Sequence, residues 1–389
     1  MTVEVVRLSG FVVGMLVVVL TMWGVFTSLV VPRASSSRLQ TLVGRMLGST
    51  ARALAPRLPN YESRDRLLSF VGPGTMVALF GLWIGLLILG FALIEWWNSG
   101  IDFASALGIA GSSVFTLGIA SARDAGAHTI EILAAGFGLL VIALEIAYLP
   151  ALYNAFAVRE TEVTLLATRA GLPAWGPEIL ARHHWLDTMN ELPPLYASWE
   201  RWAAAVSESH ANYPALMWFR SPAPFRSWLL GLVAMMDSAA LYHSASPEMT
   251  PREARTCLQM GMNCLRSMAS ALKIPFDPDP IPSAPLRLTR AEFDKGMTRL
   301  QAVGFPMERD ADETWRHFRG WRVNYEGIVD ALTGLIVPPP APWFARRPES
   351  GDTEYPLILN RTPDEPEGAH AFGVSKIFKT PSERESNNS

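Results

Sequence analysis

Glu145 is the residue whose chemistry is most unusual for its surroundings, because it interrupts the apolar stretch of residues 129–156. It follows Glu131 by fourteen residues, which corresponds to about 21 Å of helix rise. An ionisable side chain at such depth in a membrane usually has a function. It shares a helix face with Ile142 and Leu149. If copies of the chain surround one axis, we expect this face to line a central cavity.

The alternative for Glu145 is a carboxyl that carries a proton, or that pairs with a neighbouring helix. A ring of close carboxylates would repel and share protons, so conduction or block through such a cavity would depend on pH.

A second unusual segment is the uncharged run of residues 103–122, which is rich in Gly, Ser and Thr and is framed by Asp102 and Arg123. We expect a short helix over about residues 103–113, followed by an extended return. Irregular backbone survives at membrane depth only where it is buried in protein or lines water. The run therefore predicts a re-entrant loop whose backbone carbonyls face ions. The alternative is a helix of small residues that only packs against its neighbours.

Three long apolar runs must hold these residues in place. They lie between Arg7 and Arg33, between Arg66 and Glu95, and over residues 129–156. Each exceeds the roughly 20 residues that cross about 30 Å of hydrocarbon. We therefore predict the α class: an all-helical membrane protein with three transmembrane helices, a re-entrant pore loop and a mostly α-helical cytoplasmic domain.

The linker between the first two spans is basic, with arginines at positions 33, 38, 45, 52, 57, 64 and 66 against Glu62 and Asp65. Positively charged loops stay in the cytoplasm. This predicts a multi-pass protein of the cell (inner) membrane, with its N-terminus outside and its C-terminal domain cytoplasmic.

Within this linker, Arg38, Arg45 and Arg52 recur every seven residues opposite an apolar face. Such a basic amphipathic helix is typical of one that lies on an anionic membrane surface. A helix packed on the soluble domain has the same periodicity, so that alternative stays open.

The segment Thr116, Leu117, Gly118, Ile119 and Ala120 resembles the T-V-G-Y-G filter of the tetrameric potassium-channel (pore-loop cation channel) family. The resemblance covers roughly residues 71–156. It implies an outer helix, a pore helix, a filter and an inner helix, arranged as a homotetramer that conducts monovalent cations. Ile119 and Ala120 replace the family's tyrosine and second glycine, so the filter is degenerate. Alanine resists the left-handed backbone that glycine permits. This favours cation permeation of less strict selectivity, or a pore that no longer conducts, over strict potassium selectivity.

Flexing points are expected in the third span. Gly136 and Gly138 lie where the family's inner helix often hinges, and Pro150 would kink the helix near its cytoplasmic end. We predict these residues as a gating hinge.

Other chemistry has less support. His183 and His184, with Asp187 and Glu191, have the spacing of a metal site on a helix, but adjacent histidines face different directions and no second ligand cluster follows. Cys257 and Cys264 are expected in the core. No nucleotide, hydrolase or zinc-protease motif occurs. We expect no enzyme activity, no cofactor and no bound metal, and the net charge of −3 argues against nucleic acid.

The predicted organisation has five parts: an anchor (1–32), a linker with the interfacial helix (33–70), a pore domain (71–157), a cytoplasmic helical domain (158–338) and a disordered tail (339–389). The predicted function is an ion-channel-like protein whose partners are the lipid membrane, its own copies and cations. One alternative is a membrane-anchored scaffold or receptor that binds proteins through its helical domain. A second is an anchored metal-dependent enzyme built on His183 and His184.

Overall fold

The computed structural model describes residues 2–31, 38–121 and 125–344. All regular elements in these ranges are helices, and no strand occurs in them. The chain divides into two compact units. The first comprises Met1–Pro59, Arg66–Phe156 and His210–Phe219; the second comprises Asn60–Asp65, Ala157–Ser209 and Arg220–Ser389.

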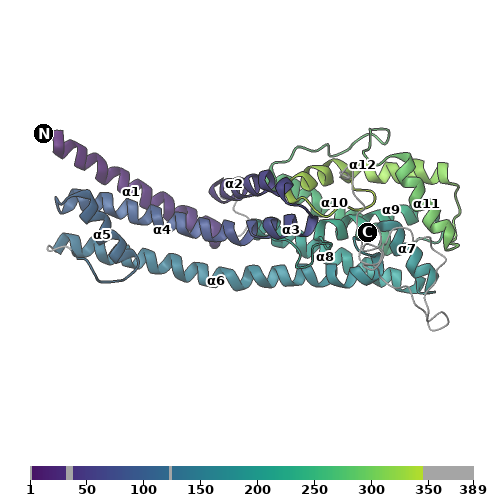
Figure 1. Ribbon diagram of the computed structural model, residues 1–389, viewed down its shortest axis with the longest axis horizontal. Helices are drawn as coiled ribbons and strands as arrows, with labels where there is room; N and C mark the ends of the chain where they lie inside the picture. The colour runs from purple at the N-terminus through teal and green to yellow at the C-terminus, as the bar shows by residue number, and fades with distance from the viewer. Residues whose placement is uncertain (1, 32–37, 122–124, 345–389) are drawn as a thin grey trace, which may run out of the picture. The chain divides into compact units, whose positions relative to one another are not determined.

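The helices follow one another along the chain as labelled in Figure 1. The first unit holds α1 (Thr2–Leu29), α2 (Arg38–Leu54), α4 (Val71–Asn98), α5 (Phe103–Val114), the first part of α6 (Ala125–Ala170) and the 3-10 turns η1 (Ala55–Arg57) and η3 (Pro214–Trp218). The second unit holds the start of α3 (Tyr61–Ser69), the end of α6, α7 (Gly176–Trp185), η2 (Met189–Glu191), most of α8 (Leu192–Asn212), α9 (Trp228–Ala245), α10 (Arg252–Leu272), α11 (Arg290–Ala302) and α12 (Ala311–Ile336).

Three helical segments of the described chain are long and apolar enough to cross a membrane: Val5–Leu29, Tyr61–Asn98 and Gly126–Ala170. They overlap the three runs expected from the sequence, and they support a membrane-embedded protein. The third helix continues past residue 157 without a break and ends at Ala170.

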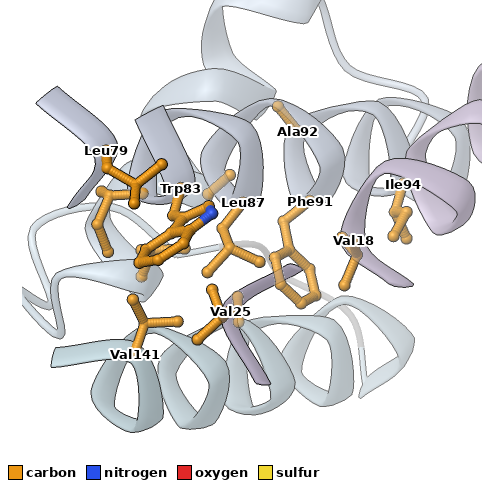
Figure 2. Close-up of a cluster of buried hydrophobic side chains, with 13 residues drawn as sticks. Val18, Val25, Leu79, Trp83, Leu87, Phe91, Ala92, Ile94 and Val141 are labelled. Carbon is orange, nitrogen blue, oxygen red and sulfur yellow. The ribbon is translucent and has the colours of Figure 1, made fainter. Parts of the chain in front are cut away.

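α1 packs closely along α4 because two glycines meet at their crossing. A Cβ atom on Gly14 would lie 2.6 Å from the Gly90 carbonyl oxygen, and one on Gly90 would lie 2.7 Å from a methyl group of Val18. Small residues allow this approach of two backbones in a membrane. Figure 2 shows the apolar cluster around the crossing, to which α1, α4 and α6 all contribute. Its labelled members are Val18, Val25, Leu79, Trp83, Leu87, Phe91, Ala92, Ile94 and Val141.

α2 packs against α4 and η3 through a face of small side chains. Gln40, Gly44, Gly48 and Ala51 are buried on this face. The indole of Trp218 covers the two glycines, since a Cβ atom on Gly44 would lie 2.7 Å from its Nε1. The turn η3 comes from a segment far along the chain, and it nevertheless belongs to the first unit.

α9 forms the centre of the second unit. Every residue of this helix except His243 is buried, and α7, α10 and α12 pack around it. A helix that is apolar on all sides needs such enclosure. Its length and hydropathy do not make it a candidate span.

One charged network crosses this core. Arg322 of α12 binds the carboxylates of Asp237 and Glu326, and Tyr325 donates to Asp237 at 2.6 Å. Burial disfavours a charged guanidinium, but the two carboxylates outweigh burial and raise the pKa of Arg322 well above its usual value. The network therefore keeps a cation in the core and ties α9 to α12.

The described chain ends with a segment that packs onto the second unit. Trp343 is buried, its Nε1 donates to the Glu292 carbonyl at 2.8 Å, and its ring stacks on Phe293 at 5.7 Å. A Cβ atom on Gly296 would lie 2.4 Å from the Trp343 ring, so only glycine fits there. Ordered structure thus extends into the first residues of the predicted tail (339–389), whose remainder from 345 onward lies outside the described residues.

Candidate functional site

The short helix expected over residues 103–113 is α5, Phe103–Val114. It begins at Asp102, whose carboxylate accepts hydrogen bonds from the Ser105 backbone N–H at 2.9 Å and from the Ser105 hydroxyl at 2.8 Å. This is the usual capping of a helix N-terminus by aspartate. In Figure 1, α5 turns back from the end of α4 and runs alongside it.

The buried face of α5 is formed by small and branched apolar residues. Ala106, Ile109, Ala110 and Val114 are buried, at the three- and four-residue spacing of one helix face. Ala110 and Val114 belong to the cluster that also holds Val141 of α6. α5 is therefore held between α4 and α6.

The C-terminal end of α5 meets α6 at Gly138. A Cβ atom on Gly138 would lie 2.1 Å from the Val114 carbonyl oxygen, far inside contact distance. Gly138 follows Ala125, the first residue of α6, by thirteen residues, or about 20 Å of helix rise. The C-terminal end of α5 therefore contacts α6 about 20 Å along that helix from its first residue, Ala125.

The end of α5 is set by two backbone hydrogen bonds. The Leu117 N–H donates to the Ser112 carbonyl at 2.7 Å, and the Thr116 N–H donates to the Ser113 carbonyl at 2.9 Å. This pattern is the Schellman motif, whose terminal residue has a left-handed backbone and is usually glycine. Here that residue is Thr116, with φ of 54°. A β-branched residue in this conformation is strained by about 1–2 kcal/mol.

The chain after Thr116 is bound to the last turn of α5 through the buried side chain of Ser112. Its hydroxyl oxygen accepts from the Ile119 N–H and from the Ala120 N–H, both at 3.1 Å. Four N–H groups of the return segment, those of residues 116, 117, 119 and 120, therefore point back to α5. No donor in the described chain binds the carbonyl oxygens of residues 116–120.

The residues predicted as a filter thus lie together on one short return segment, and their side chains are open. Leu117 is 58% exposed and Ile119 is 80% exposed, and nothing lies within 4 Å of a Cβ atom built on Gly118. The left-handed positions are Thr116 and Gly118, whose φ is 67°. Ala120, the residue expected to resist a left-handed backbone, is not left-handed.

Glu145 lies on the face of α6 that turns toward the rest of its chain. The buried residues Ala134, Val141, Tyr148 and Leu152 follow one another at helical spacing, and Glu145 falls in the same stripe. Glu145 is half-buried, and its Oε2 atom is enclosed without a hydrogen-bond partner in the described chain. The predicted companions Ile142 and Leu149 are also half-buried. Glu145 therefore faces the packed side of α6, between Val141 and Tyr148. A ring of Glu145 carboxylates around a central cavity remains a prediction.

The predicted hinge residues lie inside a continuous helix. α6 includes Gly136, Gly138 and Pro150 without a break. Gly136 has open space around it, whereas Gly138 is required by the contact with Val114. The structure gives Gly138 a packing role, and flexing at these three positions remains a prediction.

The predicted membrane-surface helix has a second, protein-facing side. Leu42 and Met46 of α2 are exposed, and so is Arg45, while Arg52 is half-buried; the side chain of Arg38 lies outside the described residues. The exposed apolar side chains remain open for a membrane surface. The small-residue face that meets α4 and Trp218 was not anticipated from the sequence.

The histidine and cysteine positions show structural surroundings. The Nδ1–H group of His183 donates to the Ile179 carbonyl at 2.7 Å, and burial lowers the pKa of His183. His184 lies against Phe305 with ring centroids 5.8 Å apart. Cys257 and Cys264 are buried free thiols, and burial raises the pKa of Cys264 to about 12. No group of three or more His, Cys, Asp or Glu side chains in the described ranges is arranged to hold a metal ion.

Sequence reasoning missed Ser112 as the residue that organises the return segment, and it missed the part that η3 plays in the first unit. The signal for Ser112 was weak, because a serine within a run of small residues is equally typical of helix packing. The η3 segment carries no apolar run of membrane length, so nothing in its sequence assigns it to the first unit.

Neither a protein-family model nor a curated protein nor a solved structure matches this chain. The resemblance of residues 116–120 to a potassium-channel filter therefore remains a prediction from the sequence.

Proposed function

We propose that this protein forms a cation-permeable pore with copies of itself, and that residues 116–120 form its narrowest part. Potassium, or monovalent cations less selectively, are the permeant ions. The resemblance to tetrameric pore-loop channels supports four copies around one axis. No residue is assigned a catalytic role, and no cofactor is required.

The arrangement of α4, α5 and α6 carries this proposal. α5 packs along α4, ends at the level of Gly138, and the chain must then climb about 20 Å to the start of α6. The ten residues 115–124 that join the two helices could span at most about 36 Å. A short helix followed by a non-helical return is the shape expected of a re-entrant loop, and such backbone is stable at membrane depth where it is buried or lines water.

The hydrogen bonds of the return segment give a second line of support. Its N–H groups are used by the end of α5 and by Ser112, whereas the carbonyl oxygens of residues 116–120 accept nothing in the described chain. Rings of backbone carbonyls are what replace the water shell of an ion in a selectivity filter. A segment that consumes donors and leaves acceptors attracts cations rather than anions.

The open side chains support self-assembly. Phe115, Leu117 and Ile119 are all exposed in the single chain, although they lie beside the carbonyls. In the proposed pore, neighbouring copies cover these side chains while the backbone faces the axis. The helical second unit would assemble or gate the pore in the cytoplasm, with the N-terminus outside and the protein in the cell (inner) membrane.

The decisive experiment is ion flux into liposomes that contain the full-length protein, with potassium and sodium compared. Gly118→Ala is the sharpest variant, because it forces an alanine into a left-handed backbone without any steric contact. Gly108→Ala is its matched control, since Gly108 also has open space but lies in helical backbone. We expect flux in the wild type and in Gly108→Ala, and altered selectivity or lost flux in Gly118→Ala.

Three results separate this proposal from its alternatives. If Glu145→Gln has the same potassium and sodium flux as the wild type, Glu145 has no role as a cavity ring, but the pore itself is still supported. Absence of flux under every ionic and pH condition would favour a membrane-anchored scaffold that binds partners through the second unit. A monomeric or dimeric protein in mild detergent would contradict four-fold assembly.

A further inference from the structure

An apolar groove runs between α1, α4 and α6 in the first unit. Its volume is about 870 Å³. Except for Asn98 and Thr129, its lining side chains are apolar or glycine, and they include Trp23 and Phe26 of α1 and Phe137 of α6. We call this cavity the α1–α6 groove. The glycine crossing holds α1 close against α4, and residues of α1, α4 and α6 line the groove.

The groove is long and parallel to the helices. Along α1 its lining extends from Phe11 to Phe26, and along α6 from Gly126 to Phe137. These stretches correspond to about 22 Å and about 16 Å of helix rise. One leaflet of a bilayer contributes about 15 Å of hydrocarbon, half of the whole core. The groove therefore matches the length of one acyl chain.

Two polar side chains at one end of the groove, Arg7 and Asn98, each have one buried nitrogen without a hydrogen-bond partner in the described chain. The Nδ2 atom of Asn98, which lines the groove, is buried without a hydrogen-bond partner in the described chain. Arg7 lies one turn before Phe11; its guanidinium donates to the Gly100 carbonyl at 2.9 Å and lies 5.8 Å from the Trp96 ring centroid. Its Nε atom is likewise buried without a partner among the described residues. One cationic and one neutral donor are thus left for an anion.

We propose that the α1–α6 groove binds one phospholipid per chain, with an acyl chain along the groove and the phosphate at Arg7 and Asn98. The lipid belongs to the leaflet on the side where α4 ends and α6 begins. A phosphate supplies the acceptor oxygens and the negative charge that these two donors lack. Water does not fill an apolar cavity of this kind, whereas hydrocarbon surrounds it in a membrane.

A helix from a second copy is the competing occupant. The apolar face of such a helix carries no acceptor or negative charge for the donors of Arg7 and Asn98, whereas a phosphate carries both. The phospholipid site does not depend on whether the protein conducts ions.

The test is native mass spectrometry of the full-length protein, purified in mild detergent and supplied with phosphatidylglycerol of defined chain length. Leu133→Trp fills the groove from α6, and Leu139→Trp is the matched control, because Leu139 is 61% exposed and does not line the groove. Arg7→Gln tests the phosphate contact, and Arg66→Gln is its control, because Arg66 is exposed on another helix. Melting curves of all four variants establish that they are folded.

We expect one phospholipid per chain in the wild type, Leu139→Trp and Arg66→Gln. We expect at least tenfold lower occupancy in Leu133→Trp, and weaker retention in Arg7→Gln. Wild-type occupancy in a folded Leu133→Trp protein would overturn the proposal. So would a retained molecule without a phosphate group, no retained lipid at all, or a disulfide joining the Val19→Cys positions of two chains, since Val19 lines the groove.

Discussion

The contact between Gly138 and Val114 gives the sharpest prediction, because the chain supplies its own control two residues away. Alanine at position 138 would place a Cβ atom 2.1 Å from the Val114 carbonyl oxygen. Ordinary contact begins near 3.4 Å, so the end of α5 must move away by roughly 1 Å. Alanine at position 136 meets nothing within 4 Å.

The two substitutions should therefore differ in their effect on the free energy of unfolding. Alanine favours a helix interior over glycine by about 1 kcal/mol, so Gly136→Ala should be neutral or stabilising. Overpacking a well-packed site costs about 1–3 kcal/mol, which cancels or exceeds that gain in Gly138→Ala. The displacement of α5 also shifts the return segment that Ser112 holds. We expect Gly138→Ala to unfold at lower temperature and to lose or alter cation flux, while Gly136→Ala does neither.

The assay is thermal unfolding in detergent together with potassium flux in liposomes, on the wild type and both variants. Equal stability and equal flux in the two variants would refute the argument that α5 is seated on Gly138. A flux defect in Gly136→Ala alone would instead support the predicted hinge, because that position has no packing role.

Three further predictions follow from the described contacts. Ser112→Ala removes the acceptor for the N–H groups of Ile119 and Ala120 and should change flux or ion preference. Ser113→Ala is the control, because the Ser113 hydroxyl makes no hydrogen bond within the described residues; equal behaviour of the two variants would contradict the role of the Ser112 hydroxyl. Arg322→Met leaves the buried carboxylates of Asp237 and Glu326 without their cation and should lower the free energy of unfolding by about 3–5 kcal/mol. Denaturant titration measures this loss, and a loss below about 1 kcal/mol would count against a stabilising role of the network. Burial lowers the pKa of His183 in the folded state, so the unfolded state takes up a proton first as pH falls below about 6.5. Between that pH and the pKa of the folded state, the free energy of unfolding falls by up to about 1.4 kcal/mol per pH unit. His183→Asn should reduce this loss in melting curves between pH 7.5 and 5, and an unchanged slope would show that burial of this histidine is not the cause.

Much of the architecture was predictable because it depends on local chemistry. The apolar runs and the small-residue run after Asp102 predict three long helices and a short fourth, and all four occur. The seven-residue periodicity of the linker likewise predicted a basic amphipathic helix, which is α2. These features are written in consecutive residues, so the sequence alone contains them.

The contacts that define the candidate site were not predictable in this way. That Gly138 receives the end of α5, that Ser112 binds two N–H groups, and that Trp218 covers the glycines of α2 all join residues brought together by packing. The sequence does not distinguish a glycine that permits a close backbone contact from one that has open space around it. Gly136 and Gly138 differ only in what lies beside them.

The sequence by itself therefore determined that this chain has helices fit for a membrane, where a short helix interrupts them, and that the residues 116–120 resemble a filter. The tertiary structure decided which backbone atoms of that segment are used and which are left open, which face of α6 carries Glu145, and where a groove remains beside α1. The physical reason is that hydropathy and capping act along the chain, whereas close packing and hydrogen-bond satisfaction depend on neighbours distant in sequence.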